Sequence, residues 1–255
     1  MISGRLSVSG RSAGFTKLNI ATPAYKGEYS SAYVRSFYSL LTAGPALGLR
    51  FSFSEIDYSD IVVARNYLVS NFFYNKADCS HLLFLDADMG FPHQLISEMV
   101  SLREELVGVV YPRRSIDLAK LHSLGNQPFA RAYAQACSFI GSPGDPHPRN
   151  PGFRRVDCCG TGILLIARSC IARMLEQCPG LLDMQRFKHL PFASKLSTCI
   201  TPFDKVVLDD RELSEDLSFC YRWTKVCGGM IYANVTHDIQ HVSSLCVTTS
   251  RFSLF

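Results

Sequence analysis

Short apolar runs alternate with amphipathic segments from residue 18 to residue 111, and this alternation constrains the fold more than any other feature of the chain. Each run has the length of a buried strand, and each segment spaces its apolar side chains as one face of a helix does. Neighbouring parallel strands need a crossover connection of this length, so the alternation predicts a parallel sheet covered by helices. The predicted strands are residues 18–23, 50–56, 81–86 and 106–110, and the predicted helices are residues 29–41, 61–74 and 95–102.

The second half of the chain has a weaker pattern. Glycine and proline are frequent in residues 116–155, which predicts mostly loop with short strands, and residues 142–152 are the most turn-rich stretch. Residues 179–208 show little periodicity. We expect further strands at residues 156–166 and 230–235, and further helices at residues 168–178 and 213–224.

Together these patterns predict an α/β fold with a mixed, mainly parallel sheet flanked by helices and a Rossmann-like N-terminal half. We expect one domain over residues 15–245, because a chain of 255 residues can bury one large core. Its two halves would be residues 15–112 and 113–245. Residues 1–14, rich in Ser and Gly, are expected to form a flexible lead, and residues 246–255 a C-terminal tail.

Composition narrows the class of protein. Apolar residues make up 47% and charged residues 19% of the chain, and the net charge of +4 is too small to indicate nucleic-acid binding. No apolar run approaches the roughly 20 residues of a membrane span, and the N-terminus lacks the pattern of a signal peptide. The ten cysteines form no Cys-x-x-Cys pair, which argues against a structural zinc site. We expect reduced thiols and a cytoplasmic protein, for which peripheral contact with a membrane surface stays open.

The third predicted strand ends in two carboxylates one residue apart, Asp86 and Asp88. An open α/β sheet binds ligands at the carboxyl ends of its strands, so both side chains are expected at a binding edge. Carboxylate oxygens suit Mg²⁺ or Mn²⁺, and those ions suit a substrate that bears phosphate. The alternative is that one or both carboxylates cap the following helix, whose start Pro92 places close by.

An ordered set of short motifs accompanies these carboxylates and resembles the GT-A-fold nucleotide-sugar glycosyltransferases of the Asp-x-Asp, family-two-like type. The resemblance covers about residues 18–243 and implies a GT-A-like fold. Residues 15–112 would then bind the nucleotide sugar and residues 113–245 the acceptor. The motifs are, in chain order, Thr22-Pro23, Ala64-Arg65-Asn66, Leu85-Asp86-Ala87-Asp88, Gly160-Thr161-Gly162, Glu215-Asp216, and His237 or His241.

The resemblance implies a metal-dependent transfer of a sugar from a nucleotide-diphosphate sugar. Asp88 would bind Mn²⁺ or Mg²⁺ directly, and Asp86 would reach the ribose or a water bound to the metal. His241, with His237 as the alternative, would complete the metal site. The cation would offset the negative charge that builds up on the departing diphosphate. The donor-binding residues would be Thr22, Pro23, Tyr25, Asp57 (with Glu55 as its alternative), Arg65, Asn66, Asp86 and Ala87.

Inverting enzymes of this family carry their catalytic base on an acid at the position of Glu215-Asp216. The resemblance therefore implies Asp216 as the base, with Glu215 second and Asp209 or Asp210 as distant alternatives. The base would take the proton from the acceptor hydroxyl as that hydroxyl attacks the anomeric carbon. Alternatively, these acids only favour the start of a helix that Ser214 caps.

The acceptor would lie beside Gly160, Thr161 and Gly162, where small residues let a sugar approach the backbone. Alternatively, the two glycines only allow the chain to make a tight bend. The acceptor could be a sugar, a lipid-linked sugar or a protein. Arg113 and Arg114, just after the fourth predicted strand, could contact phosphate or the acceptor, and a solvated pair is equally open.

Two other enzyme classes and one binding function compete with this interpretation. Haloacid-dehalogenase-type phosphatases use the first Asp of an Asp-x-Asp motif as the nucleophile, but they carry it on their first strand rather than the third. Sugar-phosphate nucleotidyltransferases are closer in fold, but the N-terminal part of this chain lacks a Gly-rich phosphate loop with Arg or Lys. A nucleotide-sugar-binding protein of the same fold without catalytic activity stays open.

Overall fold

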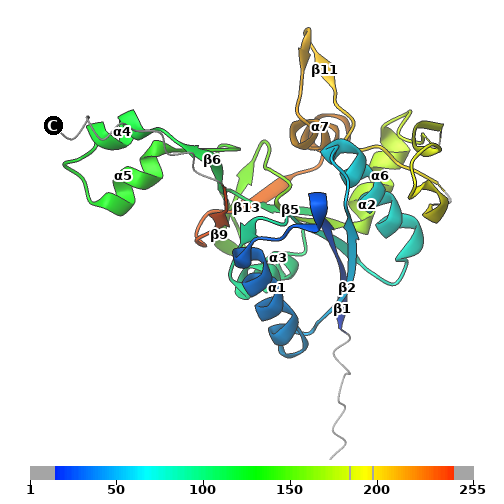
Figure 1. The fold of residues 1–255 in the computed structure, drawn as a ribbon, viewed down its shortest axis with the longest axis horizontal. Helices are drawn as coiled ribbons and strands as arrows, with labels where there is room; N and C mark the ends of the chain where they lie inside the picture. The colour runs from blue at the N-terminus through cyan, green and yellow to red at the C-terminus, as the bar shows by residue number, and fades with distance from the viewer. Residues whose placement is uncertain (1–14, 184, 197, 244–255) are drawn as a thin grey trace, which may run out of the picture.

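The computed structural model describes residues 15–243 except residues 184 and 197, and within that part the chain forms an eight-stranded sheet with helices on both faces (Figure 1). The strand order is β2-β1-β3-β10-β5-β13-β9-β8. The predicted lead over residues 1–14 and the predicted tail over residues 246–255 lie outside the described residues.

The sheet is mainly parallel, as the alternation of strands and helices predicts. β1 pairs in parallel with β2 and β3, and β13 pairs in parallel with β5, whereas β10 and β9 run antiparallel to their neighbours. The expected fold class, a mixed and mainly parallel sheet flanked by helices, is therefore confirmed. The strands are β1 Thr16–Pro23, β2 Leu49–Ile56, β3 His81–Leu85, β5 Leu106–Val109, β8 Pro146–His147, β9 Asn150–Val156, β10 Ile163–Ala167 and β13 Ile231–Asn234.

Two apolar layers lie on opposite faces of the sheet. Along β3, Leu83 and Leu85 belong to one layer, while Leu82 and Phe84 belong to the other, as the two-residue period of a strand requires. The first layer packs against α1 (Ser31–Ala43) and α3 (His93–Ser101). The second packs against α2 (Ile61–Asn75), α6 (Arg168–Gln177) and α7 (Glu215–Tyr221). Because both faces are covered, the central strands β3, β5 and β10 are apolar along most of their length.

Capping residues set the starts of the helices that approach the binding edge. The Ser30 side chain accepts a hydrogen bond from the backbone N–H of Tyr33 at the start of α1. The Asp60 side chain accepts from Val62 and Val63 at the start of α2. Such caps satisfy N–H groups that have no partner inside the helix, and they fix where the first turn begins.

The expectation that residues 116–155 are mostly loop is wrong. This stretch contains α4 (Leu118–Ser123) and α5 (Phe129–Ala136), carried between the paired strands β6 (Pro112–Ile116) and β7 (Cys137–Phe139). Glycine and proline lie between and around these helices rather than inside them. They therefore mark where the helices begin and end, and they do not prevent helix formation. In Figure 1 this arm, residues 112–139, projects away from the sheet.

The turn-rich residues 142–152 are also more ordered than expected, because β8 and β9 pair as an antiparallel hairpin. The single strand predicted over residues 156–166 is wrong. β9 ends at Val156, and β10 begins only at Ile163. The intervening glycines pack against the Tyr111 hydroxyl, which lies only 2.2 Å from where a Cβ on Gly160 would be. The chain therefore bends around Tyr111 instead of continuing as a strand.

Two further β pairs lie outside the large sheet. β4 (Met89–Gly90) pairs with β14 (Gln240–His241), and β11 (Val207–Leu208) forms a hairpin with β12 (Arg211–Glu212). Within the described part of the chain, no helix is both long enough and apolar enough to cross a membrane.

Gly229 offers a test of the packing beneath α7. A Cβ at this position would lie 2.0 Å from the ring of Trp223, which is buried and donates a 2.9 Å hydrogen bond from its indole N–H to the Met230 carbonyl. We expect Gly229→Ala to lower the free energy of unfolding by about 1–3 kcal/mol, because the ring cannot move without breaking its contacts. Urea denaturation measures this change. Gly125→Ala is the matched control, since its Cβ would meet nothing closer than 3.4 Å. Equal midpoints for the two variants would contradict the prediction.

Candidate active site

The loops at the carboxyl end of β3 bring together side chains that are far apart in the sequence. The backbone N–H of Asp86 donates a 2.9 Å hydrogen bond to the Gly162 carbonyl, which ties the end of β3 to the loop before β10. The start of α7 reaches the same place, with Ser214 capping the helix. The expected cap by Ser214 is thus present, and the two acids that follow it still face inward to Arg65.

Arg65 is the centre of this cluster. Its guanidinium is 4% exposed and donates to three carboxylates: to Glu215 at 2.8 Å, to Asp86 at 3.1 Å and to Asp216. Burial disfavours the charged form of Arg65, but the nearby carboxylates of Asp216, Asp86 and Glu215 together raise its pKa above the ordinary value. Arg65 is therefore a fixed positive charge that holds α2, the end of β3 and the start of α7 together.

Asp216 has a second partner. The Thr161 hydroxyl donates a 2.5 Å hydrogen bond to the same carboxylate oxygen that Arg65 contacts. The Gly160–Gly162 bend thus serves to present Thr161 to Asp216, and it is held in turn by the Tyr111 hydroxyl, which accepts a 3.0 Å hydrogen bond from the Gly162 N–H. Three of the predicted positions, Thr161, Gly162 and Asp216, form one connected group.

Asp88 belongs to a second group at the mouth of the site. It is paired with Arg114, whose Nε donates a 2.8 Å hydrogen bond to Nε2 of His241. The other ring nitrogen of His241 lies 2.9 Å from the Pro112 carbonyl. His241 Nε2 is 3.7 Å from a carboxylate oxygen of Asp88. The structure therefore brings the predicted pair of Asp88 and His241 together.

Negative charge exceeds positive charge among the described residues of these two groups. The carboxylates of Asp86, Asp88, Glu215 and Asp216 face the guanidiniums of Arg65 and Arg114, so ionised side chains leave a net charge of −2. Burial raises the pKa of Asp86, although Arg65 opposes that shift. One buried oxygen of Asp86 and one of Asp88 have no hydrogen-bond partner. Such oxygens are costly in a folded protein and indicate that a positively charged or hydrogen-bonding ligand belongs here.

A cleft of about 780 Å³ opens in front of these carboxylates. This volume is in the range of pockets that hold nucleotide-sized ligands. Tyr25, Tyr29 and Arg114 are among its lining residues. The predicted site residues that line the cleft are Pro23, Tyr25, Asp86, Ala87 and Asp88.

Three predicted donor-binding residues, Thr22, Asn66 and Asp57, are not among the lining residues of the cleft. Thr22 is buried and shares a 2.7 Å hydrogen bond with the Tyr33 hydroxyl. Asn66 donates to Asp204 at 2.8 Å and accepts from the Phe203 backbone. Asp57 accepts a 2.7 Å hydrogen bond from the backbone N–H of Lys26 and so fixes the loop that carries Tyr25. These contacts give the three side chains positioning roles, and direct binding to a donor stays a prediction for them.

His237 does not join the other predicted metal ligands. Its Nε2 lies 3.0 Å from a carboxylate oxygen of Glu98, and it lines a separate cavity of about 500 Å³ with Phe91 and Gln240. Over residues 15–243, with residues 184 and 197 set aside, no three or more His, Cys, Asp or Glu side chains are grouped as they would be to hold a metal ion. The four predicted ligands therefore do not form one cluster; the structure leaves the adjacent pair Asp88 and His241.

Sequence reasoning missed two tyrosines of the site. Burial raises the pKa of Tyr111 above its ordinary value, so its hydroxyl stays protonated; its ring packs edge-on against His241, with 5.3 Å between centroids. Tyr29 lines the cleft and donates a hydrogen bond to Glu55. The only sequence signal for Tyr111 was its position directly after the fourth predicted strand, which is the edge where ligands bind.

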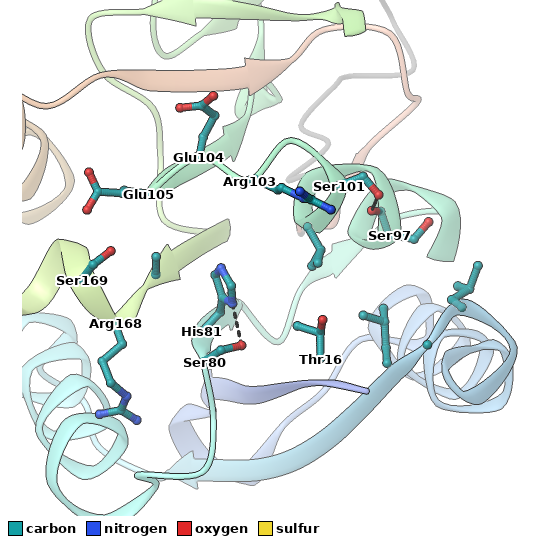
Figure 2. A pocket seen from close by; sticks show the side chains of 15 residues that line it. Thr16, Ser80, His81, Ser97, Ser101, Arg103, Glu104, Glu105, Arg168 and Ser169 are labelled. Atoms are coloured by element: carbon teal, nitrogen blue, oxygen red, sulfur yellow. Dashed lines mark hydrogen bonds between the residues drawn. The ribbon is translucent and has the colours of Figure 1, made fainter. Parts of the chain in front are cut away.

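A further cavity, of about 810 Å³, lies at the opposite edge of the sheet (Figure 2). Its lining includes Thr16 and His81, which are the first residues of β1 and β3. Figure 2 shows the Arg168 side chain turned away from this cavity, and it donates to backbone carbonyls at the end of α2. None of the predicted site residues lines it. Ligands of α/β sheets bind at the carboxyl ends of strands, so the 780 Å³ cleft is the candidate active site.

Comparison with known proteins gives likenesses in structure alone. No family model matches this sequence, and no curated protein matches it. The solved structure of A197 from STIV covers 90% of this chain and 87% of its own chain, with 14% sequence identity and a TM-score of 0.47. The structure of an active-site mutant of LgtC covers 60% of this chain, with 16% identity and a TM-score of 0.30, and this chain spans only 57% of that LgtC chain. The function of this chain must therefore be inferred from the geometry of its own site.

Proposed function

We propose that this chain is a glycosyltransferase that moves a sugar from a nucleotide-diphosphate sugar to an acceptor hydroxyl with the help of Mn²⁺ or Mg²⁺. One observation carries the proposal: a cleft of about 780 Å³ at the carboxyl edge of a mainly parallel sheet is lined by carboxylates, with an arginine and a histidine beside them. A nucleotide sugar needs a long cleft for the nucleoside, a cation for the diphosphate and an acid–base group near the sugar. The described residues offer groups suited to each need.

The residues present fit a divalent cation. Asp88 offers a buried carboxylate oxygen without a partner, and Nε2 of His241 lies beside the other oxygen of that carboxylate. Two protein ligands are few, but Mg²⁺ commonly takes only one or two carboxylates and fills its other positions with waters and substrate phosphates. The net charge of −2 over the two groups matches the charge of such an ion. When bound, the ion would stabilise the charge on the leaving diphosphate.

The same geometry supports distinct roles for the remaining residues. Asp216 is our first choice for the catalytic base, and Glu215 is the second. The Thr161 hydroxyl and Arg65 would orient Asp216, so that its carboxylate accepts the proton of the acceptor hydroxyl during an inverting displacement. Asp86 is held by Arg65 and would face the ribose side of the donor. Tyr25 and Pro23 would form the wall against the nucleoside.

One observation favours a second function, a nucleotide-sugar-binding protein without catalysis. Both candidate bases are engaged by Arg65, and Asp216 also accepts the Thr161 hydrogen bond. A carboxylate that accepts several hydrogen bonds is a weaker base, because each hydrogen bond stabilises its charged form. Catalysis therefore requires that the acceptor hydroxyl reach the remaining lone pairs of Asp216 or Glu215.

We take the acceptor to be a sugar, a lipid-linked sugar or a protein, and we place the reaction in the cytoplasm.

Asp88→Asn tests the metal-dependent donor site. We expect the release of nucleoside diphosphate from UDP-, GDP- or CDP-sugars in the presence of Mn²⁺ to fall at least about 100-fold, because the variant loses the carboxylate that would hold the ion. Asp145→Asn, at an exposed position away from the cleft, is the control and should keep the wild-type rate. If Asp88→Asn retained both its rate and its dependence on Mn²⁺, the proposed role of Asp88 would be wrong.

Asp216→Asn and Glu215→Gln separate catalysis from binding. We expect one of them, Asp216→Asn by our choice, to lower turnover about 10²- to 10⁴-fold, the usual contribution of a general base. Stabilisation of the variant by nucleoside diphosphate and Mn²⁺ in thermal melts should persist, because the donor site stays intact. A wild-type protein that is stabilised by these ligands but turns over no donor with any acceptor tested would instead support the non-catalytic function.

A further inference from the structure

Arg114 stands between the two side chains that are suited to hold a metal ion. Its guanidinium donates to the carboxylate of Asp88 and, through Nε at 2.8 Å, to Nε2 of His241. The Asp88 oxygen and the His241 nitrogen that it contacts are 3.7 Å apart. One positively charged group thus takes up the His241 nitrogen and one of the two Asp88 oxygens, while the other Asp88 oxygen has no partner.

The hydrogen bonds of His241 show that the competition is direct. The Pro112 carbonyl can only accept, so the ring nitrogen 2.9 Å from it, Nδ1, must carry a hydrogen. The Arg114 N–H can only donate, so Nε2 of His241 must offer its lone pair. This is the neutral tautomer that binds metals, with a backbone carbonyl fixing the ring. Because Nε2 has a single lone pair, Arg114 and a metal ion cannot occupy it together.

Arg114 is free to move in a way that Arg65 is not. Its side chain is 54% exposed, whereas that of Arg65 is 4% exposed and bonded to three carboxylates. It comes from β6, at the base of the projecting arm, where its neighbours Arg113 and Ser115 are exposed as well. An exposed arginine can leave its partner without opening a core, and such ion pairs contribute little net stability.

We propose that Arg114 is an exchangeable internal cation, which pairs with Asp88 and His241 when no metal is bound and is displaced by the divalent ion that accompanies the donor diphosphate. This inference rests on the metal-dependent function proposed above. Two consequences follow from it. The affinity for a metal ion alone is reduced by competition with Arg114. The guanidinium released at the mouth of the cleft is then available to the negative charge of the diphosphate.

Calorimetric titration of Mn²⁺ alone into the full chain tests the exchange without any requirement for activity. We expect Arg114→Gln to bind Mn²⁺ roughly fivefold more tightly than the wild type, the factor expected when one partly exposed ion pair no longer competes. Arg113→Gln is the matched control, because it removes the same charge one residue away, and the arginine that contacts Asp88 and His241 is Arg114. This control should stay within about twofold of the wild type.

Asp88→Asn, introduced into the wild type and into Arg114→Gln, distinguishes the outcomes. Tighter binding by Arg114→Gln that Asp88→Asn abolishes supports the exchange, even if no sugar donor is ever turned over. Equal or weaker binding by Arg114→Gln, with Asp88→Asn still abolishing it, overturns the exchange and leaves the metal site standing. Binding that survives Asp88→Asn in both backgrounds overturns the exchange together with the proposed metal site.

Discussion

The buried guanidinium of Arg65 is the interaction on which the site depends. Asp86, Glu215 and Asp216 lie 21, 150 and 151 residues from Arg65 along the chain, and their carboxylates meet around this one positive charge. Three carboxylates without a counter-ion would repel one another at low dielectric, and removing one partner of a buried ion pair is strongly destabilising. Arg65 therefore fastens α2 to the end of β3 and to the start of α7, and it holds Glu215 and Asp216 close to Asp86, which lines the cleft.

Arg114, the second arginine of the site, differs from Arg65 in burial and in its partners. Arg65 is buried and shared among three acids, so it is a permanent part of the architecture. Arg114 is half exposed, belongs to β6 at the base of the arm, and contacts one oxygen of Asp88 and Nε2 of His241. Arg65 thus holds three acids in place, whereas Arg114 is exposed enough to leave its partners. The remaining excess of negative charge favours a divalent cation over another side chain.

Comparison of particular elements shows where sequence reasoning succeeds. The four N-terminal strands and their helices are found at the predicted places, because each is short, apolar and bounded by turn residues or caps. The arm over residues 112–139 was missed, since its helices are short and α5 buries little beyond Ala132 and Ala136. The choice between His237 and His241 was left open. The pairing of His241 with Met89 places His241 next to Asp88, whereas His237 lies beside Glu98.

The sequence by itself determined the layered α/β class and the placing of two carboxylates at the carboxyl edge of the sheet, because both follow from local periodicity and from where a strand ends. The partners of those carboxylates depend on the tertiary structure. Asp86 contacts Arg65, whereas Asp88 contacts Arg114 and lies beside His241. The two acids of α7, Glu215 and Asp216, also contact Arg65. Contacts of this kind join segments that are many residues apart. A local sequence pattern therefore does not predict which charged side chains will be buried next to each other.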